Sequence, residues 1–175
     1  MEEVNLSEPV SLLVKKGEAI VMRSVTFGDL KRALEERFGK SVAEFILFDA
    51  GFSCGVRSAD RLSKHFNVTG RDLLKKVEAH KKGEGWCELS FEEFNHLRPS
   101  GRILAKNSFE AKGYGRSDRP ICHFLRGFLS GVVSYVTGVK VVLTEVRCLA
   151  LGNEWCEFRV FRVYGPFRQP QHALS

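Results

Sequence analysis

The sequence lacks several features that mark common classes of protein. No apolar run approaches the roughly 20 residues that a membrane-spanning helix needs. The first residues, Met1-Glu2-Glu3, do not have the basic and then apolar character of a signal peptide. We find no glycine-rich dinucleotide fingerprint and no recognisable pair of nucleophile and base. These absences predict a soluble, cytoplasmic domain without a membrane span, and they do not favour an enzyme.

Charge of one sign is not concentrated along the chain. The 175 residues carry a formal net charge of +6, with small basic clusters at Lys75-Lys76 and Lys81-Lys82. Nucleic-acid-binding proteins usually gather their basic residues on one face or arm. A nucleic-acid partner is therefore not expected, and the charge is that of a solvated surface.

The length and the apolar content predict one globular domain. Apolar residues make up 43% of the sequence and include 14 phenylalanines, which is ample for a core. We expect the domain over residues 23–165. Residues 1–22 would form an N-terminal arm or an edge strand, and residues 166–175 a flexible tail.

Cysteine is scarce, and no C-x-x-C pair of the zinc-ribbon kind is present. Five cysteines in a chain without a secretion signal favour reduced thiols or metal ligands over disulfides. Three of them are Cys122, Cys148 and Cys156. Together with Glu145 they offer the four ligands of a closed tetrahedral zinc site. A chain reversal at Gly152-Asn153 would bring the last two thiols side by side, but three inert buried thiols would also explain the pattern.

The position of Glu145 raises a geometric question. In an extended strand Glu145 and Cys148 would point to opposite faces, so both can bind one ion only if the chain leaves the strand near Val146-Arg147. His123, next to Cys122, is the alternative fourth ligand. It is the weaker choice, because neighbouring side chains on a helix diverge by about 100°.

Hydrophobic periodicity predicts helices, a hairpin, a further helix and a second hairpin. The expected helices cover 24–38, 41–66, 70–82 and 118–137, and the expected strands cover 86–91, 102–109, 139–146 and 157–163. Residues 112–117 are expected to form a loop. This order predicts an α+β domain in which helices cover an antiparallel sheet.

Two of the predicted helices contain small residues at regular spacing. Ala50-Gly51 and Ser53-Cys54-Gly55 lie in the second helix, and Gly127, Ser130 and Gly131 lie in the last one. Small residues allow another helix or a ligand to approach closely, so tight helix packing and a pocket wall both remain open.

Several segments of the C-terminal half resemble the 4-vinyl reductase domain family. They read Asn-Ser-Phe-Glu-Ala at 107–111, Gly-Arg-Ser-Asp-Arg-Pro-Ile-Cys at 115–122, Gly-Phe-Leu-Ser-Gly at 127–131, Glu-Val-Arg-Cys-Leu-Ala-Leu-Gly at 145–152 and Cys-Glu-Phe at 156–158. That family includes ligand-sensing domains of phenol- and xylene-responsive bacterial regulators and stand-alone archaeal proteins. The resemblance implies a fold similar to that of Bet-type vesicle-tethering subunits and, more distantly, of haem-based nitric-oxide sensors. It also implies a homodimer.

The resemblance implies a structural zinc ion. In the aromatic sensors of the family, one Cys, one Glu and two further Cys hold the ion, and these positions fall on Cys122, Glu145, Cys148 and Cys156. Because the protein fills all four positions, no open coordination site remains for catalysis.

The resemblance also implies a module that binds or senses a small apolar or aromatic molecule. The candidate walls of its site are Phe45, Phe48, Phe52, Phe109 and Phe124. The chain departs from the aromatic sensors at Leu104 and Ala105, near which the family has an aromatic residue. The histidine that contacts the phenol hydroxyl in those sensors has no clear counterpart in this sequence, and His65 is the residue considered for its place. A more apolar ligand therefore fits as well as phenol.

Three other functions remain open. The three clustered cysteines could form a redox sensor, and the family name implies a reductase acting on a vinyl group. A third possibility, which rests only on the analogy of fold with Bet-type subunits, is that the chain is a subunit of a larger assembly. The ATPase and DNA-binding domains of the bacterial regulators are not found in this sequence, so a sensing output would need a partner protein.

Overall fold

The computed structural model describes residues 15–17, 20–95 and 99–167. Most of the predicted N-terminal arm and residues 168–175 of the predicted tail lie outside the described residues. The helices are α2 (Ser24–Phe38), α3 (Lys40–Phe66), α4 (Gly70–Gly83), α5 (Phe109–Tyr114) and α6 (His123–Thr137). The strands are β1 (Glu88–Asn95), β2 (Ser100–Lys106), β3 (Val139–Arg147) and β4 (Cys156–Pro166), and the short 3-10 helix η1 (Leu149–Leu151) precedes β4.

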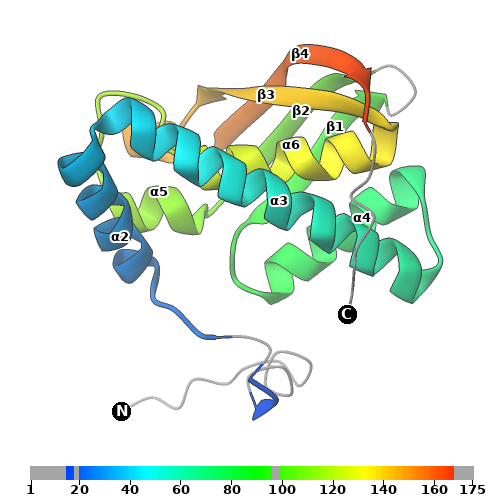
Figure 1. Cartoon of the computed structure of the whole chain (residues 1–175), viewed down its shortest axis with the longest axis horizontal. Coiled ribbons are helices and arrows are strands. Elements are labelled where there is room, and N and C mark those ends of the chain that lie inside the picture. The colour runs from blue at the N-terminus through cyan, green and yellow to red at the C-terminus, as the bar shows by residue number, and fades with distance from the viewer. Residues whose placement is uncertain (1–14, 18–19, 96–98, 168–175) are drawn as a thin grey trace.

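The four strands form one antiparallel sheet in the order β1-β2-β4-β3. The two predicted hairpins are thus joined through their second strands. In Figure 1 the sheet forms one layer, while α3 and α6 run side by side along it. Helices α2 and α5 lie at one end and α4 at the other. The predicted α+β fold, an antiparallel sheet covered by helices, is confirmed.

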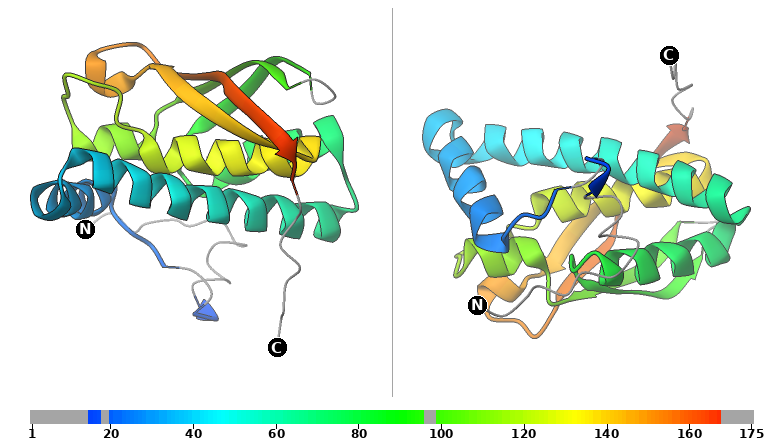
Figure 2. Two further views of the ribbon diagram at one scale, coloured as in Figure 1. Left: turned by 45° about the horizontal axis from the view of Figure 1, so that its top comes forward. Right: turned by 90° about the horizontal axis from the view of Figure 1, so that it is seen from below.

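Glycine lets α3 and α6 meet backbone to backbone. A Cβ atom added to Gly55 would lie 2.0 Å from the carbonyl oxygen of Phe128, and one added to Gly127 would lie 2.1 Å from that of Phe48. Gly51 and Gly131 make equivalent approaches. Both views of Figure 2 show the two helices alongside each other over most of their length. The small residues of α3 therefore serve tight helix packing, and the helix seam leaves no room for a ligand.

Polar side chains of α6 bind the edge of β3. The hydroxyl of Ser130 accepts a hydrogen bond from the Leu143 amide at 3.1 Å, and that of Ser134 accepts one from the Val141 amide at 2.8 Å. Since the two serines are four residues apart, they lie on one face of the helix. This contact fixes the position of α6 against the strand that carries Glu145.

The segment before α6 differs from its prediction. Helix α5 occupies part of the predicted loop, and Ser108 caps it by accepting a hydrogen bond from the Ala111 amide at 3.4 Å. Helix α6 begins at His123 rather than near residue 118. The Ser117 amide instead donates to the carbonyl oxygen of Ala150 at 2.9 Å, which holds the segment in an extended course. A tertiary contact therefore moves the start of α6 away from the position that the sequence predicted.

The first turn of α6 takes its cap from a distant residue. The buried carboxylate of Glu110 accepts hydrogen bonds from the amides of Phe124 at 3.2 Å and Leu125 at 2.9 Å. The ammonium of Lys31, also fully buried, lies 3.4 Å from Glu110 and donates to the carbonyl oxygen of Ile121. Helices α2 and α5 thus hold the start of α6, where the candidate site lies.

Candidate functional site

The structure brings together the four residues predicted as zinc ligands. Cys122 immediately precedes α6, Glu145 lies on β3, Cys148 follows β3, and Cys156 begins β4. Their four ligand atoms lie within 4.8 Å of one another, and all four side chains are buried. The Cys122 sulfur is 3.5 Å from that of Cys156 and 4.0 Å from that of Cys148.

A bulge in β3 answers the geometric question about Glu145. Glu145 pairs with Phe158, but Arg147 pairs with Glu157, so β3 advances two residues while β4 advances one. The extra residue, Val146, shifts the alternation of the side chains. Glu145 and Cys148 consequently reach the same face, although they are three residues apart.

The chain reversal between the two last cysteines follows the predicted turn. Gly152 adopts a left-handed conformation with φ of 89° directly after η1. The side-chain oxygen of Asn153 accepts a hydrogen bond from the Cys148 amide at 3.0 Å, which closes the turn. Both residues were expected to make the reversal, and they place Cys156 beside Cys148.

The electrostatics of the cluster favour a bound cation. Burial, and then the charge of Cys148, raises the pKa of Glu145 to about 9. Burial raises the pKa of the Cys122 thiol, whereas hydrogen bonds from Cys122 and then Cys156 lower the pKa of Cys148 to about 2. Without a cation the cluster therefore favours the thiolate form of Cys148 and the protonated forms of Cys122 and Glu145. A divalent cation would allow all four groups to ionise and bind it.

The donor atoms fit a tetrahedral zinc ion. Zinc–sulfur bonds of about 2.3 Å place two thiolates about 3.8 Å apart in tetrahedral geometry, close to the two sulfur–sulfur distances given above. One carboxylate oxygen of Glu145 accepts a hydrogen bond from the Cys122 amide at 2.9 Å. The other is buried and has no hydrogen-bond partner in the described part of the chain, so it is available as a ligand.

Neighbouring groups orient the sulfur atoms. The Ser108 hydroxyl lies 3.5 Å from the Cys122 sulfur, and the Leu149 amide donates to the Cys156 sulfur at 3.3 Å. Such contacts fix the direction of metal ligands and offset their charge. By contrast, the Nδ1 atom of His123 lies 3.8 Å from a carboxylate oxygen of Glu44, and His123 is not part of the ligand group found among the described residues.

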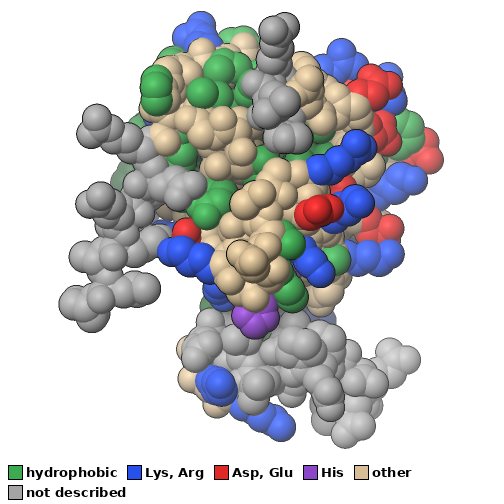
Figure 3. Space-filling model, turned by 90° about the vertical axis from the view of Figure 1, so that its right-hand side faces the viewer, with side chains coloured by type: hydrophobic (Ala, Val, Ile, Leu, Met, Phe, Trp, Pro, Cys, Tyr) green, Lys and Arg blue, Asp and Glu red, His purple; other side chains and the backbone are tan. Residues whose placement is uncertain are grey.

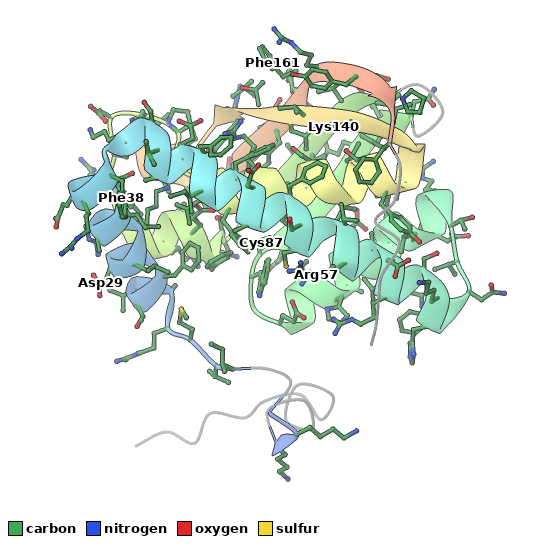
Figure 4. All side chains as sticks on the ribbon, viewed as in Figure 1. Asp29, Phe38, Arg57, Cys87, Lys140 and Phe161 are labelled. Atoms are coloured by element: carbon green, nitrogen blue, oxygen red, sulfur yellow. The ribbon has the colours of Figure 1, made fainter. Side chains whose placement is uncertain are left out.

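A cavity of about 790 Å³ reaches the first turn of α6, where Phe124 lines it two residues after Cys122. Its apolar wall includes four aromatic residues from four different segments of the chain: Phe27, Trp86, Phe109 and Phe124. The Phe27 ring packs edge-on against Phe109 and Phe124, with centroids 5.0 and 5.6 Å apart. The Trp86 ring lies 5.3 Å from Phe109 and 5.7 Å from Phe124. Cys87, labelled in Figure 4, and the exposed residues Ile20, Val21 and Met22 complete the apolar lining.

Two of the five phenylalanines predicted to bind a ligand, Phe109 and Phe124, line this cavity. The other three belong to α3 and are not among its lining residues. Phe45 is 65% exposed, Phe48 packs 4.7 Å from the Arg126 guanidinium, and the Phe52 ring lies 5.8 Å from that of Phe167.

Two aromatic residues of the cavity wall, Phe27 and Trp86, were not among the predicted ligand-binding residues. Phe27 lies in the helix expected at 24–38 and Trp86 begins the strand expected at 86–91, and neither pattern distinguishes a core from a cavity. His65 is exposed, packs against the neighbouring Phe66 ring at 4.6 Å and does not line the cavity.

The surface shows mixed charge. On the face drawn in Figure 3, lysine and arginine side chains are interspersed with aspartate and glutamate side chains. Within the described ranges, no helix is both long and apolar enough to cross a bilayer.

Comparison with known proteins gives related sequences and folds. Residues 102–162 match the model of the V4R domain. The phenol regulator MopR of Acinetobacter guillouiae is 27% identical over 151 residues, which cover 78% of this chain but only 26% of that regulator.

Two solved structures share the fold. The phenol-responsive sensory domain of the transcription activator PoxR, determined with phenol, aligns with a TM-score of 0.72 and 21% identity over 85% of this chain and 76% of that chain. A trafficking protein particle complex subunit 3 from Naegleria fowleri, covalently bound to palmitic acid, aligns with a TM-score of 0.63 and 14% identity over 83% of this chain and 95% of that chain. The expected likeness to Bet-type subunits is thus a likeness of fold. With the V4R match at residues 102–162, the resemblance of this chain to the 4-vinyl reductase domain family is confirmed.

Proposed function

We propose that this chain binds a small apolar or aromatic molecule in the cavity between α2, α5 and the start of α6, as the sensing module of a larger response. The observation that carries the proposal is the aromatic wall formed by Phe27, Trp86, Phe109 and Phe124 around about 790 Å³. Ligand sites of about 300–1,000 Å³ are usually lined by apolar and aromatic side chains with a few polar groups. A hydrophobic core of this size would instead be filled by side chains.

The relatives support this class of ligand. MopR is a phenol regulator, and the PoxR domain was determined with phenol. This chain lacks a histidine in the described cavity lining, so its site has less to offer a phenol hydroxyl and favours a more apolar molecule. Because the match spans about a quarter of MopR, the output of the response is proposed to come from another protein or domain.

The cluster of Cys122, Glu145, Cys148 and Cys156 is proposed to hold a structural zinc ion. When bound, the ion would supply cross-linking rather than catalysis, since the protein provides all four ligands. It would tie the end of β3, the start of β4 and the start of α6 together. Phe124, which lines the cavity, lies two residues after Cys122, so the metal would also keep one wall of the cavity in position.

A homodimer through α2 and α3 is also proposed. Apolar side chains at least 40% exposed occur along these helices and include Leu30, Phe38, Val42, Phe45 and Ile46. An apolar surface of this kind usually marks an interface. Burial in a dimer would explain the exposure of Phe45, which does not reach the cavity. A molar mass of two chains in light scattering, reduced to one chain by Phe45→Glu, would support the interface.

Binding can be measured by tryptophan fluorescence. The chain has two tryptophans, Trp86 in the cavity wall and Trp155 elsewhere, so a Trp155→Phe background reports on Trp86 alone. We expect saturable quenching or a spectral shift with 6-phenyl-1-hexanol as the probe. Phe109→Leu should weaken binding about tenfold, because lost apolar contact in a pocket costs about 1–3 kcal/mol. Phe45→Leu is the matched control and should leave binding unchanged. Absence of saturable binding in metal-containing protein would contradict the proposal.

A further inference from the structure

The charged residues at the mouth of the cavity are unbalanced. Its lining contains three cations, Arg23, Lys82 and Lys112, and two carboxylates, Glu84 and Glu88. Both carboxylates already have cationic or polar partners, and the question is which of the three cations remain unpaired.

The two carboxylates are engaged by residues nearby in the chain. Glu84 forms an ion pair with the buried ammonium of Lys81 and lies 3.0 Å from Nδ1 of His80. Burial alone would disfavour its charge, but the nearby imidazole of His80 and the Lys81 ammonium hold the pKa of Glu84 at about 2. Glu88 lies 3.8 Å from the Lys82 ammonium. Neither carboxylate is therefore free to neutralise a third cation.

Arg23 and Lys112 remain without an ion-pair partner among the described residues. The backbone brings them to the same side of the cavity although they are distant in sequence. Gly113 packs directly on Ser24, such that a Cβ atom added to Gly113 would lie 1.9 Å from the Ser24 carbonyl oxygen. Arg23 precedes Ser24, and Lys112 precedes Gly113, so the two cationic residues flank one backbone contact.

The start of α2 adds to this positive region. Arg23 is the N-cap residue of α2, the first turn of the helix contains no acidic residue, and no side chain caps it. The amides of a helix N-terminus carry partial positive charge and favour an anion. The helix N-terminus thus adds a partial positive charge to the two side-chain charges of Arg23 and Lys112, both of which belong to the lining of the cavity.

We infer that the ligand is an amphiphile with an apolar body and a single acidic headgroup, such as a carboxylate, which lies between Arg23 and Lys112. This inference rests on the proposed function and names the chemical class of the ligand. The aromatic wall of Phe27, Trp86, Phe109 and Phe124 takes the apolar body. The cavity is of a size that holds a drug-sized molecule rather than a single ring, so a chain or a ring with a chain fills it better than phenol.

A matched pair of probes separates this inference from the proposed function. The probes are 6-phenylhexanoate and 6-phenyl-1-hexanol, which share their apolar part and differ in charge. Their affinities are measured from Trp86 fluorescence in the Trp155→Phe background, at low and at high salt. The variant Arg23→Met with Lys112→Met removes the two charges and keeps side-chain length. Arg57→Met with Lys75→Met is the control, because it removes two exposed charges that do not line the cavity (Arg57 is labelled in Figure 4).

We expect the acid to bind about tenfold more tightly than the alcohol at low salt, and this preference to shrink at high salt because ions screen exposed charges. The Arg23/Lys112 variant should lose the preference while binding the alcohol as before, and the control variant should keep it. Equal binding of both probes in the unmodified chain would overturn the acidic headgroup and leave the apolar site intact. Failure of both probes to bind would overturn the proposed function itself.

Discussion

The Cys/Glu cluster and the cavity both involve the start of α6, yet they are built in opposite ways. The cluster takes all four of its side chains from residues 122–156, and their ligand atoms lie within 4.8 Å of one another. The cavity takes its wall from four segments spread between Phe27 and Phe124 and is defined by the space that they leave. A metal site is thus recognisable from residue types and spacing, whereas a cavity depends on where distant segments stop packing. If the two regions are independent, substitutions in the cluster and substitutions around the cavity should change different measurable properties.

The largest expected effect is that of Cys148→Ser. Loss of one of four ligands should abolish stoichiometric zinc and lower the free energy of unfolding by about 4 kcal/mol or more, since metal binding contributes folding energy. Elemental mass spectrometry and denaturant unfolding measure the two quantities. Cys87→Ser is the control: its thiol is also buried but lies outside the cluster, so zinc should be retained.

The same experiment can overturn the zinc assignment. If the unmodified chain contains no metal and its clustered thiols oxidise in pairs, the redox-sensor alternative becomes the better description of Cys122, Cys148 and Cys156. The short distance between the sulfur atoms of Cys122 and Cys156 makes that pair the first to examine.

A smaller but clear effect is expected at the seam between α3 and α6, the helix that contributes Phe124 to the cavity. Gly55→Ala would push a methyl group to 2.0 Å from the Phe128 carbonyl oxygen. The helices must move apart, which should cost about 3 kcal/mol in the free energy of unfolding. Gly83→Ala at the end of α4 is the control, because no described atom lies within 4 Å of the added methyl group. That substitution should be neutral or slightly stabilising, and equal losses in both variants would contradict the packing argument.

The smallest expected effect concerns the mouth of the cavity. The pKa of Glu84 is held at about 2, below its ordinary value of 4.5, so its ionised form stabilises the folded state. This stabilisation is fully present above pH 4.5 and is lost as the pH falls from 4.5 toward 2. Glu84→Gln should cost about 1 kcal/mol at neutral pH, a value reduced by solvent screening.

Chemical unfolding of both proteins from pH 7 to pH 3 measures this difference. The gap in the free energy of unfolding between the unmodified chain and Glu84→Gln should stay constant down to about pH 4.5 and then narrow. A gap that widens at low pH would mean that Glu84 is stabilised in its protonated form, and the account of the ion pairs at the mouth would be wrong.

The sequence predicted the helices, the strands and their sheet type well, because each depends on local periodicity. It also predicted which side chains gather at the metal centre. The sequence did not show how Glu145 and Cys148 reach the same face. The bulge at Val146 that brings them there depends on pairing with β4, so it leaves no local signal in the sequence.

The prediction was weakest where packing decides. The glycines of α3 allowed both a helix contact and a pocket wall, and only the position of α6 distinguishes them. The last helix was expected to begin at residue 118, but the Ser117 amide bonds to Ala150, and Glu110 caps α6 from its later start at His123. The wall of the cavity depends on the same long-range packing, so the sequence pointed to Phe109 and Phe124 but not to Phe27 and Trp86, which line the cavity with them.

The contact between α6 and β3 bears on how copies of this chain can aggregate. A strand at the border of a sheet normally offers free amides on which a foreign strand can add, and fibrils grow in this way. Here the amides of Val141 and Leu143 are already taken by the hydroxyls of Ser134 and Ser130. At the opposite border, the Phe91 amide of β1 donates to the Glu78 carboxylate at 2.9 Å. At these positions both borders of the sheet therefore disfavour the addition of a foreign strand.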